Sequence, residues 1–190
     1  SGQAVLRFFT QFADSTKVSY TWNASLPDSQ QAFLNGDVAF YIGYASEARF
    51  LTAANPNLDF DMAPIPQPQS ATTRTTYGLG YALVIPKVGK NQAGAYTIAT
   101  VLTAPAIVSA LATELGMAPA NRTLLTPNGN DPFASIYYPE ALNAQGWVSP
   151  APSVVDSIFS VMISNMITGR TQTQGALTSA DQSLNAAFSH

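Results

Sequence analysis

The scarcity of β-strand patterns is the feature that most constrains the fold of this chain. Strand-like patterns occur in only three stretches, residues 38–42, 58–62 and 77–86. Helical periodicity recurs in about seven segments, at residues 4–12, 28–35, 46–55, 91–103, 105–115, 154–168 and 173–188. A doubly wound sheet normally needs more strands than this. We therefore expect an α/β fold in which further strands are hidden from periodicity or are supplied by sequence absent from this chain.

Capping signals mark the starts of two of these helices. Asp28 is predicted as an N-cap, with Gln31 three residues later completing a capping box. Ser153 and Asp156 form the same pattern before the helix expected at 154–168. Gly36 is predicted to end the first of the two helices in the left-handed conformation.

The loop GYASE, residues 43–47, follows the first predicted strand and leads into the next helix. Ser46 is predicted to cap that helix. In open α/β sheets, ligands bind beyond the carboxyl ends of the strands, where loops lead into helices. Free amides at a helix N-terminus also suit polar or anionic ligand groups. This loop is therefore predicted to line a ligand site.

The charge distribution excludes nucleic-acid binding. The chain has 8 basic and 11 acidic side chains, a net charge of −3, and basic residues scattered along its length without a patch that could follow a phosphate backbone. It has no cysteine, which excludes thiolate chemistry and cysteine metal sites. We expect no cofactor, no metal and no nucleic-acid partner.

The inventory of catalytic side chains is also sparse. The only histidine is His190, the last residue, so a Ser-His-Asp triad is not expected. Asp59 and Asp61 fall on one side of a predicted strand, where they could act as paired carboxylates or bind Ca²⁺; the alternative is a solvated strand face. We therefore predict that the protein is not an enzyme.

Aromatic residues next to predicted loops favour a binding function. Trp22, Tyr44, Tyr81 and Trp147 all fall in or beside such loops. Flat aromatic rings are good platforms for the apolar faces of sugars and other small ligands. Ordinary core or hinge packing is the alternative for each of the four.

Three segments resemble a known family in order and spacing. They are AFLNGDVAFYIGY (residues 32–44), NPNLDFDMAPIPQ (55–67) and TGRTQTQGALTSADQSLNAAF (168–188). Together they are similar to bacterial extracellular solute-binding proteins, in particular the sugar-binding ABC-importer group related to maltose-binding protein. The resemblance implies an α/β, periplasmic-binding-protein-like fold of two lobes, of which this chain supplies the C-terminal half.

The resemblance also implies a division of the chain between the lobes and a set of partners. Residues 1–66 and 131–190 would belong to the C-terminal lobe, and residues 67–130 would cross into the N-terminal lobe. The implied partners are a small-molecule ligand (carbohydrate first), ABC permease subunits, and the N-terminal half of the same protein. Self-association of the isolated chain is also expected, because a lobe without its first strands exposes sheet edges. The implied location is extracytoplasmic, in the periplasm or as a lipoprotein anchored at the cell surface.

Transferred position by position, the family's cleft falls on several loops and helix starts of this chain. The sugar-stacking tryptophan of the family is replaced here, nearest by Ser46. The expected ligand-binding residues are Trp22, Asn23, Tyr44, Ser46, Glu47, Gly78, Tyr81, Trp147, Ser153 and Asp156. The expected function is solute capture for an ABC importer. A surface-binding or adhesive module that keeps the fold without transport is the alternative.

Overall fold

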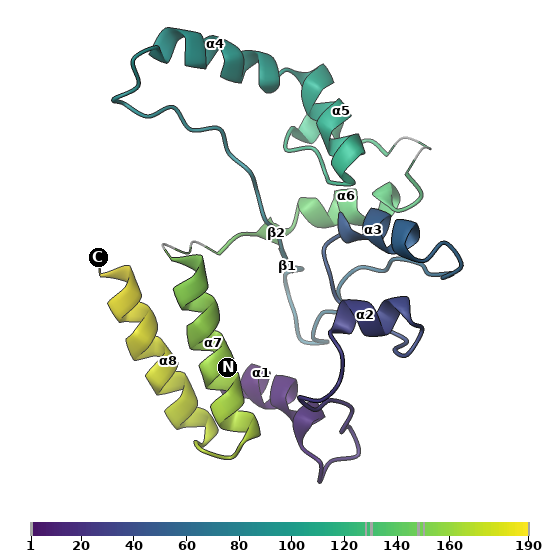
Figure 1. The fold of residues 1–190 in the computed structure, drawn as a ribbon, viewed down its shortest axis with the longest axis vertical. Coiled ribbons are helices and arrows are strands. Elements are labelled where there is room, and N and C mark those ends of the chain that lie inside the picture. Colours follow the sequence, from purple (N-terminus) through teal and green to yellow (C-terminus); the bar gives the residue numbers. More distant parts are fainter. Residues whose placement is uncertain (1, 128, 130, 148, 150, 190) are drawn as a thin grey trace. The chain divides into compact units, whose positions relative to one another are not determined.

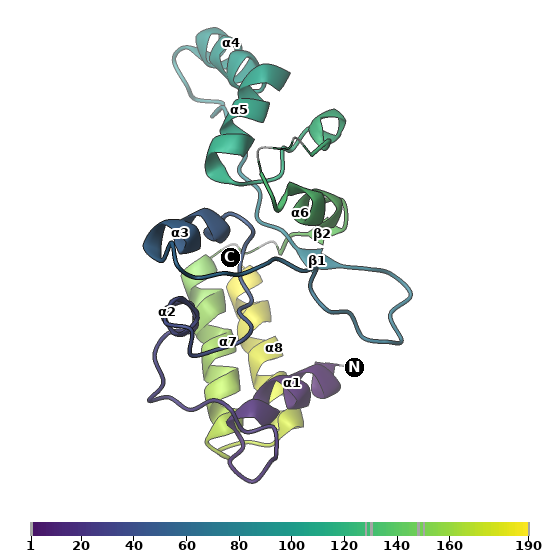
Figure 2. The same cartoon turned by 90° about the vertical axis from the view of Figure 1, so that its right-hand side faces the viewer.

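The computed structural model describes residues 2–127, 129, 131–147, 149 and 151–189. Helices dominate these residues, as Figures 1 and 2 show. Contacts within the chain group into two compact units, one made of residues 1–27 and 148–190 and the other of residues 28–147.

The first unit is built from helices. Its elements are α1 (Gly2–Thr10), the 3₁₀-helix η1 (Gln11–Ala13), α7 (Pro152–Ile167) and α8 (Thr173–Phe188). α7 and α8 run side by side as a hairpin, and α1 packs against both (Figures 1 and 2). Gly169 ends α7 with φ of 68°, in the left-handed region where glycine has no Cβ penalty. Leu6 of α1, Val155 of α7 and Ala176 of α8 are buried.

The second unit contains the remaining helices and the strands. Its elements are α2 (Ser29–Leu34), α3 (Glu47–Ala54), β1 (Thr76–Tyr77), α4 (Gln92–Leu102), α5 (Pro105–Leu115), the 3₁₀-helix η2 (Arg122–Leu124), α6 (Ala134–Ala141) and β2 (Ala144–Gln145). The largest buried cluster centres on α6, where Ala134, Tyr137 and Tyr138 pack against Met62 and Phe133. Phe60, in the segment before β1, stacks on Phe133 with centroids 5.6 Å apart and contacts Phe33 of α2 edge-on at 5.9 Å, so both rings join this cluster.

The helices follow the sequence predictions closely. α1, α4, α5, α7 and α8 lie where periodicity predicts them. Asp28 caps α2, since its side chain accepts a hydrogen bond from the Gln30 amide. Gly36 follows that helix with φ of 78°. The capping box is wrong in its second half, because the Gln31 side chain donates to Asn35 instead of reaching back to Asp28.

The strand predictions are largely wrong. In the described residues the sheet consists of β1 and β2 alone, paired in parallel with Tyr77 opposite Gln145. Residues 38–42 and 58–62 form no strand, and only Tyr77 of the stretch 77–86 belongs to one. Alternation produces a strand only where another strand supplies hydrogen-bond partners for its backbone, and here these segments have none. Phe40 is accordingly 92% exposed.

Two predicted caps and one helix also differ. The Ser46 side chain makes no capping hydrogen bond at the start of α3. α7 begins at Pro152 after Ala151, so Ser153 lies inside the helix and forms no capping box with Asp156. The prediction missed α6, which contains Pro139. Proline usually ends a helix, because it lacks an N–H group, and here it lies in the last turn.

The helix-rich chain with few strands is compatible with a periplasmic-binding-like fold. The lobe assignment (residues 1–66 and 131–190 against 67–130) concerns the two-lobed fold and stays a prediction. Within the described residues, no single helix is long and apolar enough to cross a membrane; α4 and α5 satisfy the same criteria only as a pair, bent by 65°.

Candidate functional site

The loop before α3 is organised around a single carboxylate oxygen. Oε2 of Glu47 accepts hydrogen bonds from the Tyr41 hydroxyl (2.8 Å) and from the Tyr44 amide (3.0 Å). Burial, and then the hydrogen bond to Glu47, raise the pKa of the Tyr41 hydroxyl. Both bonds have a charged acceptor, which makes them stronger than bonds between neutral groups. The side chain of Glu47, the first residue of α3, thus ties the preceding loop to the helix.

Gly43 makes this arrangement possible because it has no side chain. A Cβ atom at position 43 would lie 2.0 Å from Oε2 of Glu47 and 2.6 Å from the Tyr41 ring. Both distances are shorter than any real Cβ contact. The backbone conformation of Gly43 is not left-handed, so close approach, and not φ, is what requires glycine here.

Three tyrosines and the fixed carboxylate form what we call the aromatic cluster: Tyr44, Tyr77, Tyr81 and Glu47. The Tyr44 and Tyr77 rings lie with centroids 6.2 Å apart and planes tilted by 49°. Tyr44 is 47% exposed, Tyr77 54% and Tyr81 81%. The pKa of the Tyr44 hydroxyl is raised most by burial and then, in decreasing order, by Tyr77, Glu47 and Tyr81. Tyr77, Glu47 and Tyr81 therefore lie within electrostatic reach of the Tyr44 phenol.

The short strand pair determines where Tyr77 lies. Tyr77 is the last residue of β1, and the next amide, that of Gly78, donates to the Gln145 carbonyl of β2 (3.2 Å). A Cβ atom at Gly78 would lie 2.7 Å from the Cβ atom of Ala144. Gly78 therefore lets β1 and β2 approach closely. Its predicted contact with a ligand stays a prediction.

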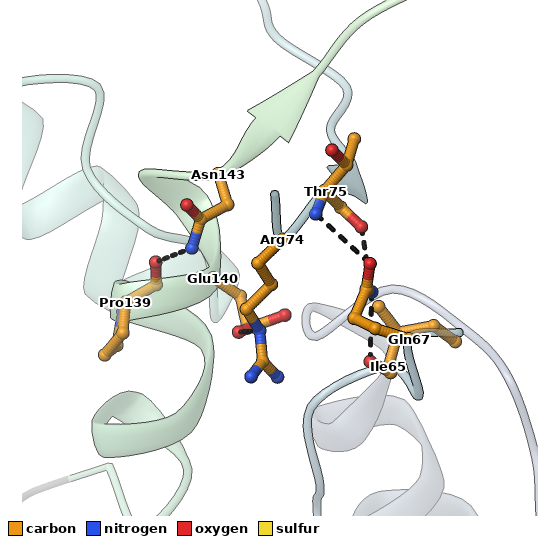
Figure 3. A network of polar contacts seen from close by, with 7 residues as sticks. All are labelled: Ile65, Gln67, Arg74, Thr75, Pro139, Glu140 and Asn143. Atoms are coloured by element: carbon orange, nitrogen blue, oxygen red, sulfur yellow. Dashed lines mark hydrogen bonds and ion pairs between the residues drawn. The ribbon is translucent and has the colours of Figure 1, made fainter. Parts of the chain in front are cut away.

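The segment that leads into β1 is held by an ion pair and by one side-chain amide. Arg74 Nε lies 2.8 Å from Oε1 of Glu140 on α6. Gln67 bonds the Thr75 backbone in both directions, because its amide nitrogen donates to the Thr75 carbonyl (3.0 Å) and its oxygen accepts from the Thr75 amide (3.3 Å). Figure 3 shows both contacts and the Gln67 bond to the Ile65 carbonyl. These contacts fix the chain immediately before Tyr77.

Two other predicted residues line a groove in the first unit. Trp22 and Asn23 lie beside one face of α7, in a groove of about 360 Å³ that also includes Ser160, Ser164 and Ile167. The oxygen of the Asn23 side chain accepts from the amide and the hydroxyl of Ser25, so it is used within its own turn. The groove is therefore lined by the half-exposed indole of Trp22 and by serine side chains of α7.

The ten predicted residues thus fall into two groups, one in each compact unit. Tyr44, Glu47 and Tyr81 come together in the aromatic cluster. Gly78 adjoins this cluster, Ser46 precedes α3, and Trp147, half exposed, follows β2. The group in the first unit consists of Trp22 and Asn23 at the groove and Ser153 and Asp156, both exposed, in the first turns of α7.

The predicted site residues did not include Tyr41 or Tyr77, and the loop at residues 43–47 was predicted without the close approach that requires glycine at position 43. The signal for Gly43 was present, because a glycine directly after an apolar stretch and before a capped helix often marks a close approach of the backbone. The spacing Tyr77–Gly–Leu–Gly–Tyr81 also placed two tyrosines in one stretch. Nothing local indicated which of these rings would meet Tyr44.

The candidate carboxylate pair for catalysis is not assembled. Asp59 and Asp61 lie in a segment without strand structure, and Asp61 accepts from the Met62 amide (2.7 Å). In the described part of the chain, no group of three or more His, Cys, Asp or Glu side chains could hold a metal ion.

Comparison with known proteins places these features in a family. The family model for bacterial extracellular solute-binding proteins matches residues 1–134, which include α1 to α5 and the whole aromatic cluster. A search of curated proteins gives no match. Because the family model covers more than half of the 190 residues, the chain belongs to the bacterial extracellular solute-binding proteins and its location is extracytoplasmic.

Proposed function

We propose that this protein is the substrate-binding component of an ABC importer, and that it captures a small carbohydrate and delivers it to a membrane permease. The aromatic cluster is the principal part of the site that this chain contributes. Its role is binding without chemistry. The half-exposed Tyr44–Tyr77 ring pair beside the fixed Glu47 carboxylate is the observation that carries the proposal.

The chemistry of the cluster suits a sugar. The C–H faces of a pyranose pack on tyrosine rings, and its hydroxyl groups donate to carboxylate oxygens. Oε2 of Glu47 already accepts two hydrogen bonds, so its Oε1 is the oxygen that remains for a ligand hydroxyl. The tyrosines replace the tryptophan that the wider sugar-binding group carries near Ser46.

In the proposed arrangement the ligand lies between two lobes, and this chain supplies the C-terminal half of that fold. Support comes from the order of the three family-like segments and from the small number of strands that pair in this chain. Trp147 is proposed as a further contact in the unit that holds the cluster. Trp22, Asn23, Ser153 and Asp156 are proposed as ligand contacts within the other unit. The N-terminal half, the permease subunits and a second copy of the chain are the proposed protein partners.

Calorimetry with a panel of mono- and oligosaccharides tests the proposal. A sugar that binds should bind about 1–3 kcal/mol more weakly to Tyr44→Ala, the range for losing a central aromatic contact. Tyr96→Ala is the matched control, because Tyr96 is an exposed tyrosine of α4 outside the cluster. Equal affinities of Tyr44→Ala and the unmodified chain for a confirmed sugar would exclude the cluster as the site.

Uptake measurements separate transport from surface binding. Cells that lack the gene should take up the identified sugar more slowly, and the unmodified gene should restore uptake where the Tyr44→Ala gene does not. Unchanged uptake in cells without the gene, together with normal sugar binding by the purified protein, would favour the surface or adhesive module.

A further inference from the structure

The charged member of the aromatic cluster is an acid, Glu47. It contributes to the raised pKa of the Tyr44 hydroxyl, after burial and the neighbouring Tyr77. A nearby cation would lower it. The two arginines of this unit with described polar contacts are engaged elsewhere, Arg49 with the Glu114 carbonyl and Arg74 with Glu140.

The rings themselves add to the negative potential of this carboxylate. A tyrosine face carries the negative part of the ring quadrupole and attracts a cation within about 6 Å of the centroid. Tyr44 and Tyr77 meet at 49°, so their faces do not cover each other, and Tyr81 is largely exposed. Three exposed tyrosine side chains near a carboxylate suit an ammonium group.

The carboxylate is held in place before any ligand arrives. The Tyr41 hydroxyl and the Tyr44 amide fix Oε2 of Glu47, and the absence of a side chain at Gly43 leaves room for them. A fixed charge loses no side-chain entropy on binding, which favours affinity.

We propose that the aromatic cluster selects a solute that carries a positively charged nitrogen, held against the rings of Tyr44, Tyr77 and Tyr81 beside the Glu47 carboxylate. An amino sugar or a quaternary ammonium compound would supply this group. The inference rests on the proposed function, because it names the ligand chemistry of the same site. It predicts discrimination against neutral solutes of the same shape.

Two pairs of probes isolate the charge. In the first pair, glucosamine carries an ammonium group, and N-acetylglucosamine carries a neutral amide in its place. In the second pair, choline carries a quaternary nitrogen, and 3,3-dimethyl-1-butanol has a neutral carbon at the same position. Titrations of the 190-residue chain at pH 7, followed by NMR at the Tyr44 amide, measure both affinity and location. In at least one pair, the cationic member should bind on the order of tenfold more tightly. The pair that shows this ratio identifies the source of the nitrogen.

Glu47→Gln tests whether the carboxylate causes the preference. Glutamine keeps an oxygen that can accept from Tyr41 and Tyr44, so the loop should stay folded while the charge is lost. In this variant the affinities for the cationic and the neutral member of a pair should differ by no more than about threefold. Glu114→Gln is the matched control, because Glu114 is an exposed residue at the end of α5 outside the cluster, and it should leave the ratio unchanged.

The remaining outcomes separate this inference from the proposed function. Neutral sugars that bind at Tyr44 as tightly as glucosamine, with no preference for choline, would overturn the inference and leave the proposed function intact. A preference for the cationic probes that Glu47→Gln does not reduce would also overturn it. No response of the Tyr44 amide to any neutral or cationic probe, sugars included, would overturn both.

Discussion

Gly43→Ala is the sharpest test of how the candidate site is built, because two effects of this substitution have opposite signs. The backbone of Gly43 is not left-handed. Alanine at such a position ordinarily stabilises a protein by about 0.4–1 kcal/mol, because the unfolded chain loses freedom. The new methyl group, however, would lie 2.0 Å from Oε2 of Glu47 and 2.6 Å from the Tyr41 ring. These are the ends of flexible side chains, so both would move away and the backbone would stay.

The expected magnitude follows from the two hydrogen bonds that this movement breaks. Bonds to charged groups contribute about 1.5–3 kcal/mol each. The Tyr41–Glu47 bond is part-buried and is taken at about 1.5 kcal/mol, and the Tyr44–Glu47 bond is exposed and is taken at about 0.5–1 kcal/mol, so the two together contribute about 2–2.5 kcal/mol. Subtracting the gain in the unfolded chain leaves a net destabilisation of about 1–2 kcal/mol. Amide exchange at Tyr44 should become roughly tenfold faster, since 1.4 kcal/mol is a factor of ten.

Urea unfolding gives the global stability, and hydrogen exchange at the Tyr44 amide gives the local one. Gly175→Ala is the matched control, because this glycine lies in α8 with open space around it and should gain about 0.5–1 kcal/mol from alanine. In a Glu47→Ala background, Gly43→Ala should lose most of its cost. A stabilising Gly43→Ala in the unmodified chain, with slow exchange at Tyr44, would refute this account of the loop.

Two further predictions concern association and alkaline pH. Static light scattering should show self-association of the chain at micromolar concentration. The reason is that many large apolar side chains are exposed, among them Phe8 of α1 and Tyr96 and Ile98 of α4. A compact monomer at that concentration would contradict this prediction. Tyr137 is 7% exposed, and its hydroxyl donates a hydrogen bond to Asp131 (2.6 Å). Burial, and then Asp131, raise its pKa well above the ordinary value of about 10. Its contribution to the free energy of unfolding is therefore complete below about pH 10 and is lost as the pH rises further. Urea titrations at several pH values above about 10 measure how the free energy of unfolding falls with pH. This fall should be less steep for Tyr137→Phe than for the unmodified chain, by up to about 1.4 kcal/mol per pH unit, and an identical fall would contradict the assignment.

Helices were predictable from this sequence because their signals are local. α5 starts with Pro105 at its first position and ends before Gly116, which has φ of 62°, and both residues are readable without tertiary information. Strands depend on partners that periodicity cannot supply. Residues 58–62 alternate clearly, yet they contribute Phe60 to an aromatic stack and form no ladder. The same limit explains α6, whose tyrosines are buried by contacts with distant segments.

The candidate site could likewise be predicted from the sequence only where its contacts are local. The proximity of Tyr44 and Glu47 was predictable because they lie three positions apart in one loop before a helix, which is a recognisable place for a ligand. The proximity of the Tyr44 and Tyr77 rings was not, because it depends on how the chain folds between them. The role of Gly43 required atomic distances, since a glycine in a loop has many possible reasons.

The two principal rings of the cluster are therefore held by different kinds of contact, and this has a consequence for binding. Tyr44 is held locally, by the bond from its own amide to Glu47. Tyr77 is held by contacts that join distant parts of the chain, namely the pairing of β1 with β2 and the ion pair between Arg74 and Glu140. Such contacts cost more loop-closure entropy to form than local ones. A ligand that contacts both rings binds only the arrangement in which β1 and β2 are paired, so it stabilises that pairing by mass action. Ligand binding and the β1–β2 ladder should accordingly be linked, with the ordering of Tyr77 as the step that connects them.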